Sequence, residues 1–257
     1  MVIRAWVILQ TVTDFFPNIG YIHDSTISLL RIDNYHKTIN NTDMKVLRVL
    51  SWVPIVSILL FIAAVTILGF ITPGYSHVSH TISRLSLGMY GNIANANLIQ
   101  LAVGGLILGI QLALSIRVPQ VRFTVLPFFL LASISLIGAA RFPTDVIAGD
   151  LPLTITNLST NGLMHTASVT VFVLLCPITI FLMVKAMISD PSWRDVARWT
   201  VAMSLVSITL SYIWVVFYVY HMFYDYRGMF QKIIVLWTLL WMLLVAFKTV
   251  RKNEMYR

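Results

Sequence analysis

Residues 73–91, PGYSHVSHTISRLSLGMYG, separate two long apolar runs and are too short and too polar to cross a bilayer themselves. The Pro-Gly pair at their start is typical of a turn. At a helical spacing the apolar residues of this stretch share one face: Val78, Ile82, Leu85 and Met89. The titratable and hydroxyl-bearing residues fall on the opposite arc: His77, His80, Ser83 and Arg84. The pattern predicts a short amphipathic helix, capped by Ser76 or Ser79 and ended by Gly88, at the membrane surface or re-entering between spans.

Composition places the chain among membrane proteins. Of its 257 residues 58% are hydrophobic and only 11% are charged, whereas a soluble globular protein has about 25% charged residues. The mean hydropathy is +0.83. A net charge of +8 would suggest nucleic acid for a soluble protein, but basic loops facing anionic lipid explain it better here. We therefore expect membrane lipids as partners, no nucleic acid and no cofactor.

Six apolar runs, each long enough for a transmembrane helix, follow a polar start. They cover residues 46–72, 95–116, 123–140, 164–186, 199–220 and 229–248. No charge lies deep inside them, and in lipid such runs are helical because no water can pair the backbone amides. We predict an all-α membrane protein, a bundle of six transmembrane helices over residues 46–250. Residues 1–45 would be a cytoplasmic tail with an interfacial helix around 2–16, and residues 251–257 a second tail.

The basic residues are distributed unevenly along the chain. Fourteen of the 18 precede or open the first run, close or follow the last run, or lie where the second run joins the third and the fourth joins the fifth. The other four lie in or beside the remaining connections: Arg84, Arg141, Arg227 and Lys232. The positive-inside rule then gives a multi-pass protein of the cell membrane with both termini in the cytoplasm. Residues 73–91 would face outward, and so would most histidines and aspartates of the connections, so we expect any site at the outer leaflet.

Two runs carry stripes of small and polar residues at helical spacing. The second run has Asn97, Gln100, Gly104 and Gln111 on one face, and the fifth has Thr200, Ser204, Ser207 and Ser211. Such residues let membrane helices approach closely and hydrogen-bond. We interpret both stripes as packing faces in preference to a transport path.

The predicted outer side holds the side chains that could carry chemistry: His77, His80, Ser83, Arg84, Arg141, Asp145 and His165. The histidines with Asp145 could hold zinc, although an H-x-x-H pair is common by chance and we expect no metal. Ser83 could attack a lipid ester, with His165 as base and Asp145 as orienter. Alternatively, the arginines and His77 and His80 could bind a lipid phosphate. A purely structural role is also open, with Asp145 and His165 capping helices and tying the outer loops together.

Three pieces of the chain resemble the domain of unknown function 998 family, whose members are six-span membrane proteins. Residues 74–109, GYSHVSHTISRLSLGMYGNIANANLIQLAVGGLILG, are similar to its G-Y-S-P-x-x-x-T-I-S-E-L signature and the Gly/Asn-rich link that follows. RFPTD at 141–145, followed by His165, is similar to the family's F-P-x-D…H pair, and GMFQK at 228–232 resembles its G-L-F-Q-R-I. The pieces occur in the family's order and cover roughly residues 46–250.

The residues of the family pattern that carry over to this chain are Tyr75, Ser83, Asp145, His165 and Gly228. Two positions depart from it. Arg84 replaces an acidic residue, so a catalytic carboxylate there would be missing, and His77 replaces a proline, so a His77–His80 metal site would be peculiar to this chain. The family implies no established activity. Its layout is similar to that of the DRAM-like group, which includes proteins linked to remodelling of lipid anchors and to lipid asymmetry, and this analogy favours lipid handling.

From the sequence we favour a polytopic membrane protein that engages lipid headgroups at the outer leaflet without catalysis. The alternative is an intramembrane lipid hydrolase or transferase that uses Ser83, Asp145 and His165. A transporter is disfavoured because no ionisable residue lies at mid-membrane. For a single outer site we expect Asp145 and His165 to pair with each other beside residues 73–91.

The charge distribution predicts which connections are accessible from outside the cell. In a chain with Cys176→Ala, the substitution Asn92→Cys should give labelling of intact cells by an impermeant maleimide. The substitution Gln120→Cys should give labelling only after permeabilisation. The reverse pattern would reject the predicted topology.

Overall fold

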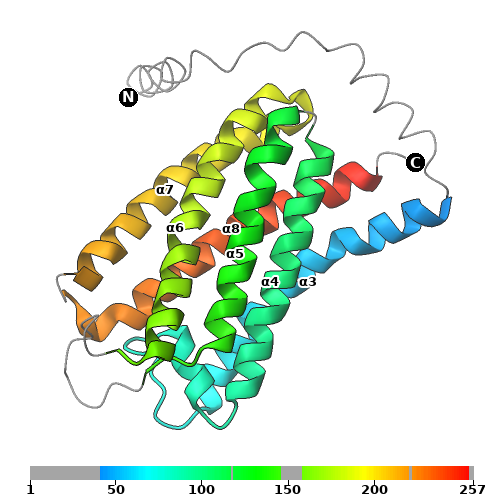
Figure 1. The fold of residues 1–257 in the computed structure, drawn as a ribbon. Helices are drawn as coiled ribbons and strands as arrows, with labels where there is room; N and C mark the ends of the chain where they lie inside the picture. Colours follow the sequence, from blue (N-terminus) through cyan, green and yellow to red (C-terminus); the bar gives the residue numbers. More distant parts are fainter. Residues whose placement is uncertain (1–40, 117, 146–157, 220–221, 255–257) are drawn as a thin grey trace. The chain divides into compact units, whose positions relative to one another are not determined.

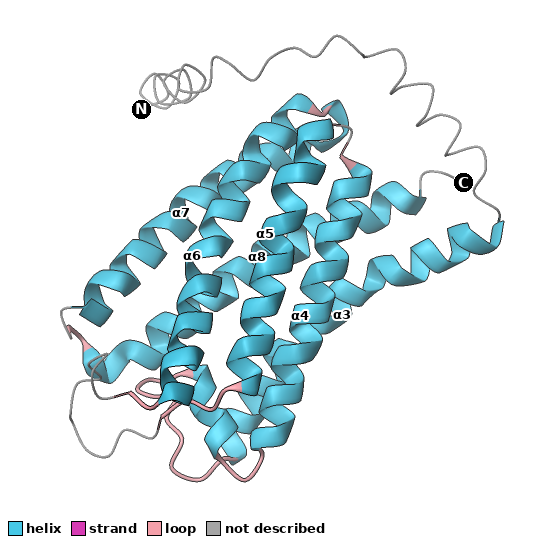
Figure 2. Ribbon diagram, viewed as in Figure 1, coloured by secondary structure: helices cyan, strands magenta, loops and turns pink. Residues whose placement is uncertain are grey.

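A computed structural model of the protein describes residues 41–116, 118–145, 158–219 and 222–254. These residues form helices, turns and connections and contain no strand (Figures 1 and 2). The elements are α3 (Asn41–Ile71), η1 (Ile82–Leu87), α4 (Gly91–Ser115), α5 (Pro119–Arg141), α6 (Thr160–Ser189), η3 (Pro191–Trp193), α7 (Arg194–Val219), η4 (Tyr224–Tyr226) and α8 (Arg227–Glu254). Contacts divide the chain into two compact units, Met1–Lys45 and Val46–Arg257, and the second unit contains the helical bundle. The helix predicted around residues 2–16 lies outside the described part.

The all-α prediction is confirmed, and each predicted apolar run corresponds to one α-helix. Five described stretches are long and apolar enough to cross a membrane: Val49–Ile71, Gly91–Ser115, Thr160–Ser189, Pro191–Phe217 and Arg227–Lys252. The apolar stretch Val125–Arg141 of α5 is shorter. Most helices extend beyond the predicted runs. Hydropathy detects only the apolar central part of a helix, whereas the backbone hydrogen bonds continue into polar turns at its ends. The chain is therefore a polytopic membrane protein.

Helices α4 to α7 pack in chain order, each against the next, and α8 contacts α4, α6 and α7. Figure 1 shows α4, α5, α6 and α7 running alongside one another, with α8 crossing behind them. One end of the bundle carries the segment 72–90, the end of α5 and the starts of α6 and α8; we call it the loop end. The other end, with the connections from α4 to α5 and from α6 to α7, is the opposite end.

The predicted packing face of α4 is confirmed, and it packs on α3. Its side chains donate hydrogen bonds to backbone carbonyls of α3: Asn97 to Phe61 (3.3 Å), Gln100 to Ser57 (3.0 Å) and Gln111 to Leu50 (2.8 Å). Gly104 lies against the Ser57 side chain, and a Cβ at Gly104 would be 2.5 Å from Ser57 Oγ. Because lipid gives apolar helices no hydrophobic reason to associate, close approach and hydrogen bonds hold α3 against α4.

The predicted packing face of α7 is also buried, with no more than 4% exposure at any of its four residues: Thr200, Ser204, Ser207 and Ser211. Two tryptophans of α8 meet this helix. Trp241 Nε1 donates to Thr200 Oγ1 (3.3 Å), and Trp237 Nε1 donates to the Met203 carbonyl (3.0 Å). The stripe therefore serves helix packing, and the tryptophans pair their indole N–H groups inside the bundle.

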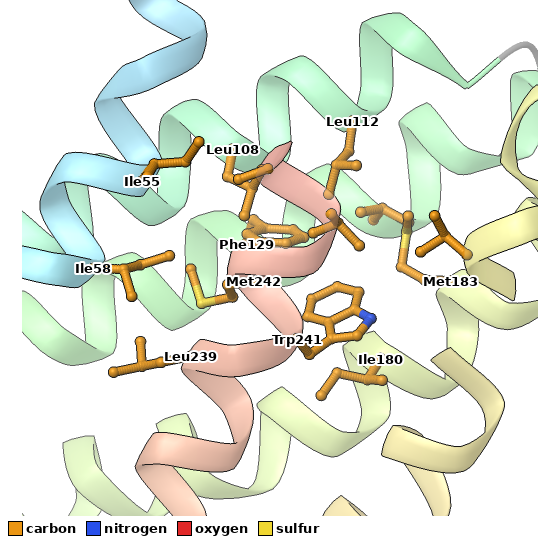
Figure 3. Close-up of a cluster of buried hydrophobic side chains, with 14 of the residues drawn as sticks. Ile55, Ile58, Leu108, Leu112, Phe129, Ile180, Met183, Leu239, Trp241 and Met242 are labelled. Carbon is orange, nitrogen blue, oxygen red and sulfur yellow. The ribbon is translucent and has the colours of Figure 1, made fainter. Parts of the chain in front are cut away.

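The core between the helices is centred on Trp241 of α8, which stacks on Phe129 of α5 with ring centroids 6.4 Å apart. Figure 3 shows these two rings among buried side chains from the surrounding helices: Ile55, Ile58, Leu108, Leu112, Ile180, Met183, Leu239 and Met242. Lipid-facing residues are equally apolar, so tight packing rather than hydrophobicity distinguishes these positions.

At the opposite end, α8 is tied to both neighbouring connections. Lys252 Nζ donates to the Ser115 carbonyl (2.5 Å) and to Ser192 Oγ (2.9 Å), and lies 5.8 Å from the ring centroid of Trp193. Ser192 Oγ donates in turn to Asp190 Oδ1 (2.7 Å). One serine hydroxyl therefore bridges a buried ammonium and a buried carboxylate, which satisfies both charges.

The segment between α3 and α4 is not one α-helix, as the apolar spacing had suggested, but turns followed by the six-residue 3₁₀ helix η1. Ser76 caps the first turn, where its Oγ accepts from Val78 N and Ser79 N, both at 3.3 Å. Gly88 follows η1 and its N–H closes on the Leu85 carbonyl. Gly88 thus ends the helix as predicted, whereas the N-cap of η1 is Thr81, without a side-chain hydrogen bond, and not Ser76 or Ser79.

The predicted apolar face of this segment is interrupted. Leu85 is 1% exposed and Ile82 packs against the core, but Val78 and Met89 are 44% and 77% exposed. The α-helical spacing does not apply here, because a 3₁₀ helix has three residues per turn rather than 3.6 and the turns before η1 have no helical repeat. The segment therefore directs two of its four apolar side chains toward the bundle and two away from it.

The close contact of Gly104 with Ser57 predicts a pair of substitutions with different outcomes. Gly104→Ala should destabilise the protein by about 1–3 kcal/mol, because its methyl group must push α3 away from α4. Gly105→Ala should change stability by less than about 0.5 kcal/mol, because its methyl would lie 3.6 Å from Met242 Cε, an ordinary contact. Unfolding of both variants in mixed detergent micelles measures the difference. Equal effects would contradict the close packing of α4 on α3.

Candidate functional site

The segment 77–82 docks directly on the first turn of α8. Gly228 lies so close to this segment that a Cβ there would overlap the backbone carbonyl of His80. Met229 N donates to the Val78 carbonyl (2.8 Å), and Gln231 Oε1 accepts from Ile82 N (2.8 Å). Only glycine permits such an approach of two backbones. The segment is thereby fixed by the residues of the GMFQK piece.

Lys232 binds the backbone of the same segment. Its Nζ donates to the carbonyls of His77 (3.1 Å), His80 (2.6 Å) and Gly228 (3.3 Å), which uses all three ammonium N–H groups. The ammonium also lies 5.2 Å from the ring centroid of Tyr75, a cation–π contact. The Tyr75 hydroxyl donates toward the carbonyls of His80 and Thr81, both at 3.2 Å. Burial raises the pKa of Tyr75, so this hydroxyl keeps its proton.

The two histidines of the segment are held neutral. His80 Nδ1 accepts from Ser76 N (3.0 Å), so the neutral ring carries its proton on Nε2. Burial lowers the pKa of His80, and the positive charges of Arg84, Arg227 and Lys232 lower it further. Burial and then Lys232 likewise lower the pKa of His77. The stabilisation from neutral imidazoles is fully present above the unfolded-state pKa and is lost as the pH falls through the lower folded-state pKa.

Asp145 caps helix α6 instead of pairing with His165. Its Oδ2 accepts from Ser159 N (2.8 Å) and its Oδ1 from Ser159 Oγ (2.5 Å), while Ser159 Oγ accepts from Gly162 N (3.0 Å). A carboxylate beside a helix N-terminus is stabilised by the helix dipole and the end N–H groups. The expected Asp145–His165 pair does not form. The Asp145 carboxylate instead accepts from two donors of Ser159, its backbone N–H and its hydroxyl.

His165 is anchored to the end of α5. Its Nδ1 lies 3.0 Å from the Ala139 carbonyl and 2.9 Å from the Phe142 carbonyl, and the side chain is only 3% exposed. His165 and Ser83 line one cavity beneath η1, so these two predicted site residues do come together. Ser83 Oγ itself lies 3.1 Å from Thr81 Oγ1.

The predicted site residues thus fall into three groups at the loop end. Ser83 and His165 face the cavity beneath η1, while His80 and Arg84 belong to the cluster around Lys232. His77 packs its ring against Phe70 and Tyr75, with centroids at 4.8 and 5.4 Å. Asp145 lies in the α6 cap, and Arg141 is exposed at the end of α5. Among the described residues, no three His, Cys, Asp or Glu side chains gather as metal ligands.

Sequence reasoning did not single out Arg227, Gln231 and Lys232 as site residues. Arg227 and Lys232 entered the topology count only as charges, and Gln231 only as a letter of the GMFQK piece. Their partners are mostly backbone carbonyls and amides, which carry no residue-type signal. One sequence signal could have found them: Gly228 is followed one helical turn later by the basic residue Lys232. A glycine and a cation at a helix start indicate that another backbone segment packs there.

The three recognised pieces of sequence meet in this region, and their family model covers most of the chain. The model for proteins of unknown function termed DUF998 matches residues 55–248. The chain belongs to the DUF998 family. The match runs from within α3 to near the end of α8, so every element of the loop end of this DUF998 protein lies inside the family region. No curated protein and no solved structure matches the chain.

The docking of the segment on α8 predicts a specific effect of a methyl group at position 228. Gly228→Ala should detach residues 77–82 and speed amide exchange of Ile82 and Met229 by about 10- to 100-fold, for a local cost of about 1–3 kcal/mol. Hydrogen exchange of the detergent-solubilised protein measures this. Met229→Ala is the matched control, because it keeps the backbone hydrogen bond and trims a partly exposed side chain. Unchanged protection in Gly228→Ala would show that the two backbones do not dock closely.

Proposed function

We propose that this DUF998 protein binds the anionic headgroup of a membrane lipid at its loop end, with Arg84 as the principal contact. The observation that supports this most directly is the gathering of three cations around one neutral imidazole. Arg84, Arg227 and Lys232 all lie close enough to His80 for their charges to lower its pKa. A concentration of like charge is unfavourable by itself and favours an anion as its counter-charge.

The three cationic side chains differ in the hydrogen bonds that they make within the protein. Lys232 donates to three backbone carbonyls, and Arg227 Nε donates to the Ser79 carbonyl (3.1 Å). The Arg84 backbone N–H donates to the Thr81 carbonyl (3.1 Å), but its guanidinium makes no hydrogen bond or ion pair with any residue that the structure describes. Its side chain is partly exposed on η1. A guanidinium presents a planar fork of donors that matches phosphate oxygens, so Arg84 is the group best suited to an incoming headgroup.

Asp145, one of the carboxylates at the loop end, is engaged outside this cluster. Both oxygens of Asp145 are taken by Ser159 at the start of α6. Arg141, exposed at the end of α5, adds a further positive charge at the loop end and would attract the same anion over a longer distance. His77 contributes by its packing, which supports the segment that carries His80.

This function includes a membrane arrangement that goes beyond the helices themselves. We take α5 as a sixth span beside the five longer ones, which gives an even number of crossings and both termini in the cytoplasm. The loop end then faces the outer leaflet of the cell membrane. The segment 73–91 would lie at headgroup depth, with Val78 and Met89 toward the lipid and Leu85 toward the bundle.

A lipid hydrolase or transferase is the less favoured function. It would need Ser83 as nucleophile, His165 as base and Asp145 as orienter, but Asp145 makes its hydrogen bonds to Ser159. The proposal for this DUF998 protein is therefore a binding function without bond cleavage.

A lipid-selectivity measurement tests the proposal. The purified protein in neutral detergent is titrated with dioctanoyl phosphatidylglycerol or dioctanoyl phosphatidylcholine, and binding is followed by native mass spectrometry. We expect preferential retention of the anionic lipid, and about fivefold weaker binding of it to Arg84→Gln, since one interfacial cation is worth about 1 kcal/mol. Raising the salt concentration should weaken binding to the wild type more than to the variant.

Arg198→Gln is the matched control, since it removes the same charge from an exposed arginine of α7 near the opposite end. It should leave the selectivity unchanged. Equal retention of the two lipids, or equal losses in both variants, would overturn the proposal.

A further inference from the structure

The partly open cavity beneath η1 has a composition unlike that of the cationic cluster. It has a volume of about 50 Å³, and ten of its thirteen lining residues are apolar. The three polar ones are Ser83, His165 and Gln231, contributed by η1, α6 and α8. In the part of the chain that the structure describes, no cationic or acidic side chain lines it. The cavity can hold a few waters or the polar end of a larger molecule.

His165 lines this cavity and carries a buried ring nitrogen without a hydrogen-bond partner among the described residues. Its Nδ1 is in reach of two backbone carbonyls, and since carbonyls only accept, Nδ1 carries the ring proton. The Nε2 of the neutral ring is then an acceptor on the opposite edge. This atom is buried and has no hydrogen-bond partner among the described residues. A buried acceptor without a donor is destabilising, so the site is complete only when something donates to it.

Gln231 presents the complementary group. Its Oε1 is occupied by Ile82 N (2.8 Å), which leaves the amide NH₂ as a donor at the cavity. The Ser83 hydroxyl can donate or accept beside it. The cavity therefore offers one acceptor, one donor and one hydroxyl within an apolar wall. A neutral hydroxyl group fits this set, because it donates to His165 Nε2 and accepts from Gln231.

We infer that the cavity binds the hydroxyl end of a neutral amphiphile, a primary alcohol on an aliphatic chain. An anionic carboxylate or phosphate fits this site less well than a hydroxyl, because the described lining is mostly apolar and offers no Lys or Arg side chain to offset the charge. A second cavity, of about 10 Å³, adjoins the first and shares four lining residues with it: Phe61, Ile82, Ser83 and Leu98. This site is separate from the proposed headgroup site, and neither depends on the other.

The test uses 1-decanol as the probe and 1-methoxydecane as its analogue without a donor. The full chain is purified in neutral detergent with ¹⁵N-labelled histidine, and both the His165 Nε2 resonance and the melting temperature are followed. Decanol should shift the resonance toward a hydrogen-bonded value and raise the melting temperature. Methoxydecane should bind at least about tenfold more weakly than decanol, because a site that pairs a hydroxyl group rejects an analogue without one.

Two substitutions in α6 separate the cavity from general partitioning of the probe. Val173→Phe fills the cavity wall without removing a hydrogen bond of His165, and should abolish the effect of decanol. Val171→Phe adds the same ring at an exposed position two residues away, and should leave the effect intact. The inference is overturned if decanol and methoxydecane bind equally or if Val173→Phe still responds. It is also overturned if Nε2 is already hydrogen-bonded without the probe and unchanged by it, which would identify bound water only.

Discussion

The loop end depends on how closely the backbone of residues 77–82 approaches the first turn of α8. Gly228 removes the side chain that would hold them apart, and Lys232 then reaches two carbonyls of the loop together with one of its own helix. Turns near a membrane surface carry many carbonyls that no ladder satisfies. One ammonium with three donors is an efficient partner for them, and the Tyr75 ring covers its remaining face. The positions of His80, Ser83 and Arg84 all follow from this docking.

Helix α8 repeats the same device at its other end. Lys252 donates to the Ser115 carbonyl and the Ser192 hydroxyl and lies beside the Trp193 ring, as Lys232 lies beside Tyr75. The two lysines are 20 residues apart in sequence, which at the helical rise is about 30 Å. That is about the thickness of the hydrocarbon core, a spacing that would place each ammonium at an interface where its charge is tolerated. Between them, Trp237 and Trp241 fix α8 to α7 by indole hydrogen bonds.

The sequence predicted the features that depend on apolarity and residue size. Long apolar runs can only be helices in lipid, and the stripe around Gly104 was interpreted as a close packing face in preference to a transport path; both predictions were confirmed. It did not predict features in which backbone atoms are the partners. The pairing of Asp145 with His165 was wrong because an N–H and a hydroxyl of Ser159, and two carbonyls of α5 and its C-terminal cap, were better placed than the opposite side chain. The 3₁₀ form of η1 was missed because its backbone is captured by Gln231 from the far end of the chain.

The short helix η1 separates two chemically opposite surfaces. Ser83 lines the neutral cavity with His165, while the next residue, Arg84, belongs to the cationic cluster around His80. Adjacent residues of a 3₁₀ helix point about 120° apart. A single step along η1 therefore separates the Ser83 hydroxyl at the cavity from the Arg84 guanidinium in the cationic cluster. Ile82 anchors η1 to α8 through the hydrogen bond from its backbone N–H to Gln231. Gln231 also lines the cavity, so a molecule bound there and the docking of η1 act on the same amide side chain. A neutral ligand inside and an anion outside would thus be recognised by one rigid turn, whose position is set by α8 and not by its own sequence.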